Sequence, residues 1–333
     1  MKLFVLKGIV IVFSKTVQMP MPRPKTEYLN NCKVANYIST QSDSFSKTLQ
    51  LTTIPKENIF VTVDLTADEN LALSNPNITQ YDMAIMDAVY TLLVNGATTF
   101  TPEMVVRIMS GNFDQDVTRQ KYEAVTTSLR KLSMIRITID CTNELRTRKK
   151  ICAGDTARLT SYLMPLREID IQSANHQTIM HGYQLIEKPV LYTYAEMINQ
   201  IINIPTELLE ISNSSGSRHL SDTDEVIVIK RALIRRIALL KNAKNHMANH
   251  TIRYEYYAST IDSETGFLVN SETGFLATLG FNKSNYSQWK KKRSSLHRII
   301  TTILDDFIKE KYIAEYEVIK QGPQKVVGVK IIL

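Results

Sequence analysis

The sequence has few of the residues that cross-link chains, bind metals or interrupt folded segments. Its three cysteines, Cys32, Cys141 and Cys152, are odd in number, and no two of them have the spacing of a zinc site. Glycine (11 residues) and proline (10 residues) are too scarce for a collagen-like or low-complexity chain. The cysteine pattern predicts a reducing, cytoplasmic compartment, and the composition predicts ordinary globular domains without a structural metal.

The first 13 residues are apolar, yet their pattern differs from that of a membrane anchor or a secretion signal. A membrane span needs about 20 apolar residues, and Lys7 interrupts this shorter run. No small-residue cleavage site follows it. A start of translation at Met19 or Met21 fits the sequence equally well. We therefore expect residues 1–18 to contribute little structure, and we expect no contact with a membrane.

The motifs of common enzyme classes are also missing. The sequence contains no G-x4-G-K-[ST] phosphate loop, no G-x-S-x-G and no G-x-G-x-x-G. His246 and His250 lie four residues apart without a neighbouring carboxylate or cysteine, which is more typical of surface histidines than of a metal pair. Asp305 and Asp306 are more typical of salt bridges or caps than of a two-metal site. We expect neither an enzyme nor a cofactor.

Positive charge is present, and it is concentrated in two segments. The net charge of the chain is +7. Residues 119–150 hold nine Lys and Arg against three acids, and residues 283–333 hold eleven against five, so the remainder of the chain is slightly acidic. Such clustering is expected for binding to a phosphate backbone. The alternative is that both segments form solvated surfaces. The secondary structure of the charged segments distinguishes these two interpretations.

The first half of the chain predicts three helices followed by strands. Apolar residues recur at helical spacing in three segments, 81–94, 101–111 and 117–132. A strand-like run at 134–141 leads into a polar, Arg-rich turn at 142–150, and further strand-like runs cover 159–171 and 179–186. Three helices and a hairpin with a basic tip are the element order of a winged helix.

The second half repeats this order. A helix is expected from 221 onwards, a strand or short helix at 251–259, and a long helix from 282 or 284 to about 310. Strands at 312–319 and 326–333 flank a turn that contains Gly322 and Pro323. An eight-residue tandem repeat, 262–269 and 270–277, is interpreted as a duplication inside a tolerant loop.

These patterns predict an α+β protein with two tandem winged-helix (helix-turn-helix plus β-hairpin) domains. Residues 1–78 are expected to form an N-terminal arm that is partly disordered and has little core of its own. The first winged-helix domain, with extra strands, covers 79–211, a Ser/Gly-rich linker covers 212–220, and the second domain covers 221–333.

Double-stranded DNA is the expected partner, because a helix can read base edges while neighbouring cations hold phosphates. The predicted contacts lie on the third helix, the C-terminal helix and the two turns: Thr118, Arg119, Lys121, Arg130, Lys131, Arg146, Arg148, Lys149, Lys150, Lys283, Ser287, Gln288, Lys290, Lys291, Arg293, Ser294, Arg298, Lys320 and Lys325. For either helix alone, an amphipathic surface helix with a solvated lysine face is an equally good interpretation. The repetition of the pattern favours DNA binding.

The two halves resemble plasmid replication initiators with tandem winged-helix domains. The resemblance covers roughly residues 79–333 and rests on the first helix from Tyr81, the helix 122–132 with its following strand, Tyr254-Glu-Tyr-Tyr257, and the segments 293–316 and 327–333. It implies binding to directly repeated origin sites as a monomer, repression of its own promoter as a homodimer, and recruitment of the host replication initiator and helicase. The extra strands between 159 and 187 and the duplicated loop depart from the family pattern.

Two other functions fit the same residues. A transcriptional regulator on this scaffold would bind a palindromic site as a dimer, whereas an initiator would bind several direct repeats. A protein-interaction module would use its basic helices to meet an acidic partner. A steep dependence of binding on salt concentration would favour either DNA-binding function over the third.

Overall fold

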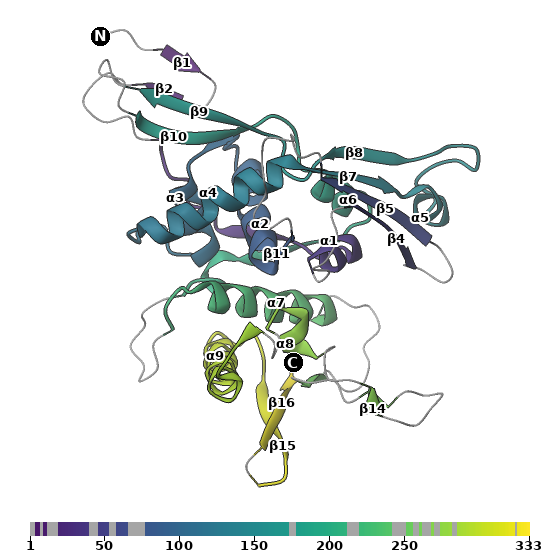
Figure 1. Cartoon of the computed structure of the whole chain (residues 1–333), viewed down its shortest axis with the longest axis vertical. Coiled ribbons are helices and arrows are strands. Elements are labelled where there is room, and N and C mark those ends of the chain that lie inside the picture. The colour runs from purple at the N-terminus through teal and green to yellow at the C-terminus, as the bar shows by residue number, and fades with distance from the viewer. Residues whose placement is uncertain are drawn as a thin grey trace. The chain divides into compact units, whose positions relative to one another are not determined.

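The structure, a computed structural model, describes residues 4–6, 9–11, 19–39, 46–52, 58–65, 77–172, 178–211, 220–241, 251–255, 260–261, 268–269, 274–281, 285–323 and 325–333. The chain forms two compact units (Figure 1): unit 1 comprises residues 1–78 and 82–210, and unit 2 comprises residues 79–81 and 211–333. The division after residue 210 lies next to the expected linker, of which 212–219 fall outside the described residues. Among the described helices, none has the length and apolar character needed to cross a membrane.

Unit 1 contains the three expected helices. They are α2 (Gln80–Val94), α3 (Pro102–Ser110) and α4 (Arg119–Met134), which confirms the predicted helical segments. Beside them, β6 (Thr99–Phe100), β9 (Leu166–Gln172) and β10 (Thr178–Leu185) form an antiparallel sheet in the order β6-β10-β9. The apolar stripes of the helices supply the core, where Leu92, Val105 and Leu129 have no exposed surface.

Local sequence explains where α3 begins and ends. The hydroxyl of Thr101 accepts a hydrogen bond from the N–H of Met104 (3.4 Å), and Pro102 occupies the first turn, where no donor is needed. The helix ends at Gly111, whose φ of 66° lies in the left-handed region. A Cβ at Gly111 would stand 2.7 Å from the backbone nitrogen of Glu210, so the close approach of these two segments also requires glycine.

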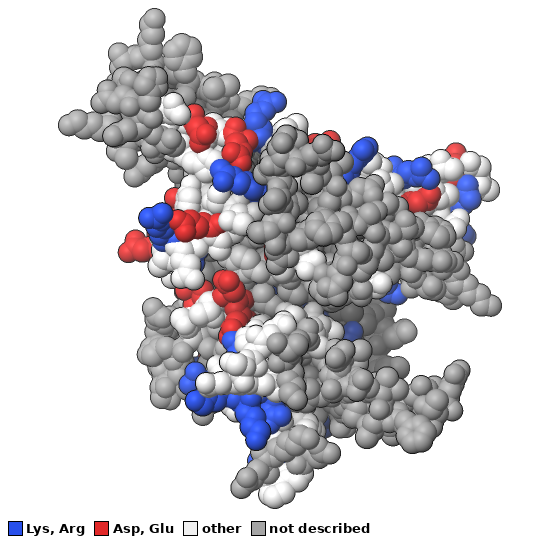
Figure 2. Space-filling model, in the orientation of Figure 1, with Lys and Arg blue, Asp and Glu red and all other residues white. Residues whose placement is uncertain are grey.

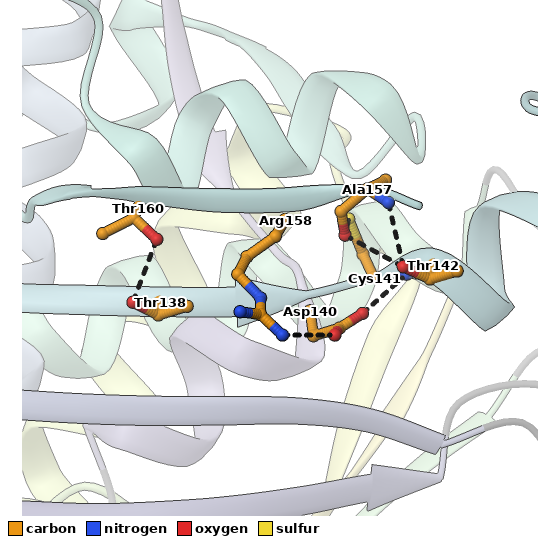
Figure 3. Close-up of polar contacts among 7 residues, drawn as sticks. All are labelled: Thr138, Asp140, Cys141, Thr142, Ala157, Arg158 and Thr160. Atoms are coloured by element: carbon orange, nitrogen blue, oxygen red, sulfur yellow. Dashed lines mark hydrogen bonds and ion pairs between the residues drawn. The ribbon is translucent and has the colours of Figure 1, made fainter. Parts of the chain in front are cut away.

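The basic turn expected at 142–150 is largely a helix, which corrects the predicted first wing. Residues Thr142–Thr147 form α5, and β7 (Ile135–Asp140) before it joins a separate sheet in the order β4-β5-β7-β8. Asp140 starts the helix by accepting a hydrogen bond from the N–H of Thr142 (3.2 Å). The Thr142 hydroxyl accepts another from the N–H of Ala157 (2.9 Å) on the approach to β8 (Figure 3). One local contact, from Asp140, and one tertiary contact, with Ala157, thus favour a helix where polar composition alone suggested a turn.

The strand-like run at 159–171 is two strands in two different sheets. β8 (Arg158–Tyr162) pairs with β7, whereas β9 begins at Leu166 and pairs with β10. Between them, the N–H groups of Leu163 and Met164 donate to the carbonyl groups of Ile135 and Leu132, and Pro165 has no N–H to continue a ladder. The hairpin that follows α4 in its own sheet is therefore β9–β10, and its tip at 173–177 lies outside the described residues.

Residues from the expected arm belong to the body of unit 1, in contrast to the prediction. β4 (Ser46–Thr52) and β5 (Asn58–Leu65) complete the sheet that contains β7, and β3 (Thr26–Asn30) pairs with β11 (Ile201–Pro205). α1 (Lys33–Ile38) follows β3, and α6 (Val190–Met197) is succeeded by β11 and a short 3-10 helix, η1 (Thr206–Leu208). Within residues 1–18, where little structure was expected, β1 (Phe4–Leu6) pairs with β2 (Ile9–Ile11).

A buried carboxylate attaches β3 to the helical core. The side chain of Asp87 on α2 has no exposed surface and accepts hydrogen bonds from the backbone N–H of Asn30 (2.9 Å) and the hydroxyl of Tyr192 on α6 (2.6 Å). The Tyr192 ring also stacks on Tyr90 of α2 with centroids 4.1 Å apart. Three segments that are distant in sequence are thus held at one point, because a buried carboxylate is costly unless donors surround it.

Unit 2 has a similar order of elements. α7 (Asp224–Lys241) is followed by β12 (Thr251–Glu255), a short pair formed by β13 (Thr260–Ile261) and β14 (Leu268–Val269), and α8 (Phe275–Thr278). The long helix α9 (Trp289–Lys309) then leads into the hairpin of β15 (Glu315–Gln321) and β16 (Lys325–Ile332). The sheet order β12-β16-β15 matches β6-β10-β9 of unit 1: in both sheets the first strand, β12 or β6, pairs with the second strand of the hairpin, β16 or β10.

The two copies of the tandem repeat differ in structure. In the first copy Leu268 and Val269 lie in β14, whereas in the second copy the equivalent Leu276 and Ala277 lie in α8. Phe275 and Leu276 are buried, so the second copy contributes to the core and differs from the tolerant loop that was expected.

We expect Asp87→Ala to lower the free energy of unfolding by about 3 kcal/mol, because it removes the buried acceptor of two hydrogen bonds. Urea unfolding followed by circular dichroism measures this change. Asp116→Ala, at an exposed carboxylate of the same unit, is the control and should change stability by less than about 0.5 kcal/mol. Equal effects of the two substitutions would contradict the role assigned to Asp87.

Candidate nucleic-acid interface

The first half of α9 and the turn before it have an exposed face that carries cations and hydroxyl groups. The residues of this face follow one another at helical spacing: Ser287, Lys290, Lys291, Ser294 and Arg298. We call this set the α9 stripe. The opposite face is buried through Leu296, Ile300 and Ile303. The hydrophobic spacing therefore fixes which side of the helix the cations occupy.

The cations of the α9 stripe are free of intramolecular ion pairs in the part of the chain that the structure describes. Lys290, Lys291 and Arg298 have none. Their neighbour Lys292 differs, because it pairs with Glu225 of α7 and its Nζ lies 4.9 Å from the centre of the Tyr286 ring. An unpaired surface cation attracts counterions from solution, and the phosphates of a nucleic acid can replace these counterions.

An open groove of about 450 Å³ adjoins the start of α9. Its lining residues are Asn285, Tyr286, Ser287, Gln288, Lys291, Lys292 and Ser295. The rings of Tyr286 and Trp289 stack with centroids 6.0 Å apart, and burial raises the pKa of the Tyr286 hydroxyl. Ser287, Gln288 and Lys291 were among the predicted contacts, but they were expected inside a helix that began at 282 or 284. The helix begins at Trp289, so Ser287 and Gln288 lie in the preceding turn. The lining residues Asn285, Tyr286, Lys292 and Ser295 were not predicted.

Other predicted residues of unit 2 lie around the stripe or outside the described residues. Lys320 is exposed near the tip of the β15–β16 hairpin, where Gly322 has a φ of 70°. Arg293 is half-buried on α9. Burial lowers the pKa of His297 on the same helix, so its imidazole adds no charge at neutral pH. Lys283 and the side chain of Lys325 lie outside the described residues.

The exposed cations of α4 are paired with acids, in contrast to those of α9. Arg119 pairs with Glu123 one turn later (2.7 Å), and Arg130 pairs with Glu168 of β9 (3.1 Å). Figure 2 shows Lys and Arg gathered over the part of unit 2 that contains α9, whereas cations and acids lie next to one another over the region of α4. Exposed ion pairs of this kind are weak, but they neutralise the surface that would face a phosphate.

The remaining predicted residues of α4 have structural contacts. The side chain of Lys131 is 11% exposed, pairs with Asp82 (2.5 Å) and donates to the carbonyl of Asn77 (2.9 Å). The Thr118 hydroxyl accepts from the N–H of Lys121 (3.4 Å) and caps the helix, and the side chain of Lys121 is half-buried.

The residues of the expected first wing lie on and after α5. Arg146 donates to the carbonyl of Asp155 (2.6 Å), and Arg148 pairs with Glu144 (3.2 Å) and donates to the carbonyl of Ile198 (3.3 Å). Glu144 is itself buried and accepts a hydrogen bond from Tyr194. Lys149 and Lys150 are exposed, and the φ of Lys149 is 56° at the end of the helix. Arg146 and Arg148 therefore fasten α5 to its surroundings.

Comparisons with known proteins place the chain in no family. No protein-family model matches it, and no curated protein matches it. Two crystal structures of domains 2 and 3 of RctB are similar to the chain. One has a TM-score of 0.43 at 9% identity and covers 86% of this chain and 91% of that chain. The other, of selenomethionine derivatives, has a TM-score of 0.40 at 10% identity and covers 86% of this chain and 90% of that chain.

Proposed function

We propose that this chain binds double-stranded DNA, without catalysing a reaction, by placing the α9 stripe in the major groove. The observation that carries the proposal is the exposed helix face with three cations that have no ion pair in the described residues. Within α9 the stripe runs from Lys290 to Arg298, about 12 Å along the helix axis. That length suits a major groove, which is about 12 Å wide and accepts one α-helix.

We also propose that each unit is a winged helix. In both units a helix, a strand and two further helices come before a hairpin, with β7, α5 and β8 inserted before the hairpin of unit 1 and the short β13–β14 pair inserted after β12 of unit 2. In both units the last strand of the hairpin lies at the centre of a three-stranded sheet. This order supports α9 as the reading helix of unit 2 and the β15–β16 hairpin as its wing. Lys320 near the hairpin tip then lies on a phosphate.

The residues of the interface have different roles under this proposal. Ser287, Gln288 and Lys291 lie at the start of α9 and line the groove on the protein surface. They contact base edges, because the N-terminal part of a reading helix lies deepest in the major groove of DNA. Lys290 and Arg298 contact phosphates on either side. Lys131, Arg146 and Arg148 are left out of the interface, because their side chains hold unit 1 together.

The first test compares two pairs of cations. Lys290→Ala with Arg298→Ala should lower the slope of log K against log salt concentration by about 2, because each lost phosphate contact removes about one released counterion. Arg119→Ala with Arg130→Ala removes the same charge from α4, where both side chains are already paired, and should change the slope much less. Fluorescence anisotropy with a labelled duplex at several salt concentrations measures both. Equal losses in the two variants would remove the distinction between α9 and α4.

The second test removes the acids that neutralise α4. Glu123→Gln with Glu168→Gln frees Arg119 and Arg130 and removes two charges that repel phosphate, so duplex affinity should rise about tenfold. Glu187→Gln with Glu207→Gln changes two exposed acids outside α4 and β9 and controls for net charge. A similar gain in the control would attribute the effect to net charge alone. No gain in either would place α4 outside the interface.

The biological role that we propose is initiation of replication of a plasmid or mobile element by binding to origin repeats. The tandem arrangement of two units with similar element order supports it, together with the sequence resemblance to plasmid initiators. Nuclease protection of the DNA that flanks the gene should reveal several direct repeats. A single palindrome bound by a dimer would instead indicate a transcriptional regulator. If no flanking fragment is bound better than random duplex, sequence-specific binding is wrong.

A further inference from the structure

The sheet β4-β5-β7-β8 of unit 1 has one buried face and one open face along β7 and β8. Ile135, Ile137 and Ile139 have no exposed surface, so these alternate residues of β7 face the core. The intervening residues form the open face with their partners on β8: Arg136 opposite Tyr162, Thr138 opposite Thr160, and Asp140 opposite Arg158. This open face has no part in the duplex interface proposed for α9.

Tyr162 is the aromatic residue of this open face, and its exposure requires an explanation. It is 42% exposed, and few large hydrophobic side chains in the described residues are as accessible. The strand register places it directly opposite Arg136, which is also exposed. A flat ring next to a guanidinium group on a sheet is the arrangement on which unpaired bases stack while their phosphates meet a cation.

The rest of the open face supplies hydroxyl groups and positive charge. The hydroxyl groups of Thr138 and Thr160 are 3.0 Å apart and form a polar strip across the two strands (Figure 3). The Arg158 side chain is 68% exposed and its pair with Asp140, at 3.3 Å, is open to solvent, so it can exchange the carboxylate for another anion. With Arg136 and Arg158 against Asp140, the open face along β7 and β8 has a net charge of +1.

This combination favours an unpaired strand over a duplex. The bases of a duplex are stacked on one another and offer no free face to a tyrosine ring. The strand register continues from β7 to β5 and from β5 to β4, so the four strands form one sheet.

We propose that the open face of β7 and β8 binds single-stranded DNA, with a base stacked on Tyr162 and phosphates on Arg136 and Arg158. The choice of DNA over RNA rests on the duplex-binding function proposed above, whereas the stacking site itself does not. Single strands are recognised on such sheets over about 4 to 16 nucleotides. A chain with both sites would hold duplex at α9 and an opened strand on unit 1.

The test measures binding of the full chain to labelled oligothymidylate of about 20 nucleotides and, in parallel, to duplex. Tyr162→Ala should weaken single-strand binding about tenfold, the value of one stacking contact. Tyr162→Phe keeps the ring and should bind as the wild type does. Val94→Ala, at a 45% exposed side chain of α2, is the control for loss of an exposed apolar group. Arg136→Ala removes the cation opposite Tyr162 and is a second variant of the same face, which should also weaken single-strand binding.

The outcomes separate this inference from the duplex proposal. Lys290→Ala with Arg298→Ala should weaken duplex binding and leave oligothymidylate binding unchanged, and Tyr162→Ala should do the reverse. The inference is overturned if the wild type does not bind oligothymidylate, or if Tyr162→Ala and Arg136→Ala both bind it normally. Equal loss of single-strand binding in the α9 variant would assign it to the duplex surface. Tighter binding of oligouridylate than of oligothymidylate would overturn the assignment to DNA.

Discussion

The architecture of unit 1 depends on the need of a buried carboxylate for hydrogen-bond donors. Asp87 lies in the middle of α2 with no exposed surface, and its donors come from β3 and α6. A carboxylate buried without such donors would destabilise the folded unit. The chain around residue 30 and the chain around residue 192 are therefore held against α2, and β3 pairs with β11 immediately after α6. A segment that has little apolar periodicity thus becomes part of the core.

The pairing of charges also distinguishes α4 of unit 1 from α9 of unit 2. On α4 each exposed arginine has an acid nearby, on the same helix or on β9. On α9 the lysines and the arginine of the stripe have no such partner within the described residues, and the acids Asp305 and Asp306 lie at the far end of the helix. Both helices carry a net positive charge, but the exposed arginines of α4 are paired with acids and the cations of the α9 stripe are not, in the described part of the chain. The difference follows from the partners and not from the count of basic residues, which is why the proposed interface is centred on unit 2.

The candidate site could be predicted from the sequence where one helix carried all of it. The stripe on α9 follows from apolar spacing, because the buried positions fix the side that the cations must take. The first wing could not be predicted in this way. The polar, Arg-rich residues 142–150 have the composition of a turn, but contacts from Asp140 and Ala157 stabilise α5 there. Arg146 and Arg148 then donate to carbonyl groups far along the chain or in the next loop, and no local pattern announces such partners.

The two copies of the tandem repeat have nearly the same sequence but different secondary structures. Both copies contain Ser-Glu-Thr-Gly-Phe-Leu, yet Leu268 lies in a strand and Leu276 in a buried helix. The residue that follows differs, Val269 against Ala277, and these favour strand and helix respectively. By itself the sequence determined the long amphipathic helices and the placement of charge on α9, because these depend on neighbours within a few residues. Only the tertiary structure decided sheet membership, the partners of buried polar groups and which cations stay unpaired, since each depends on segments brought together from distant parts of the chain.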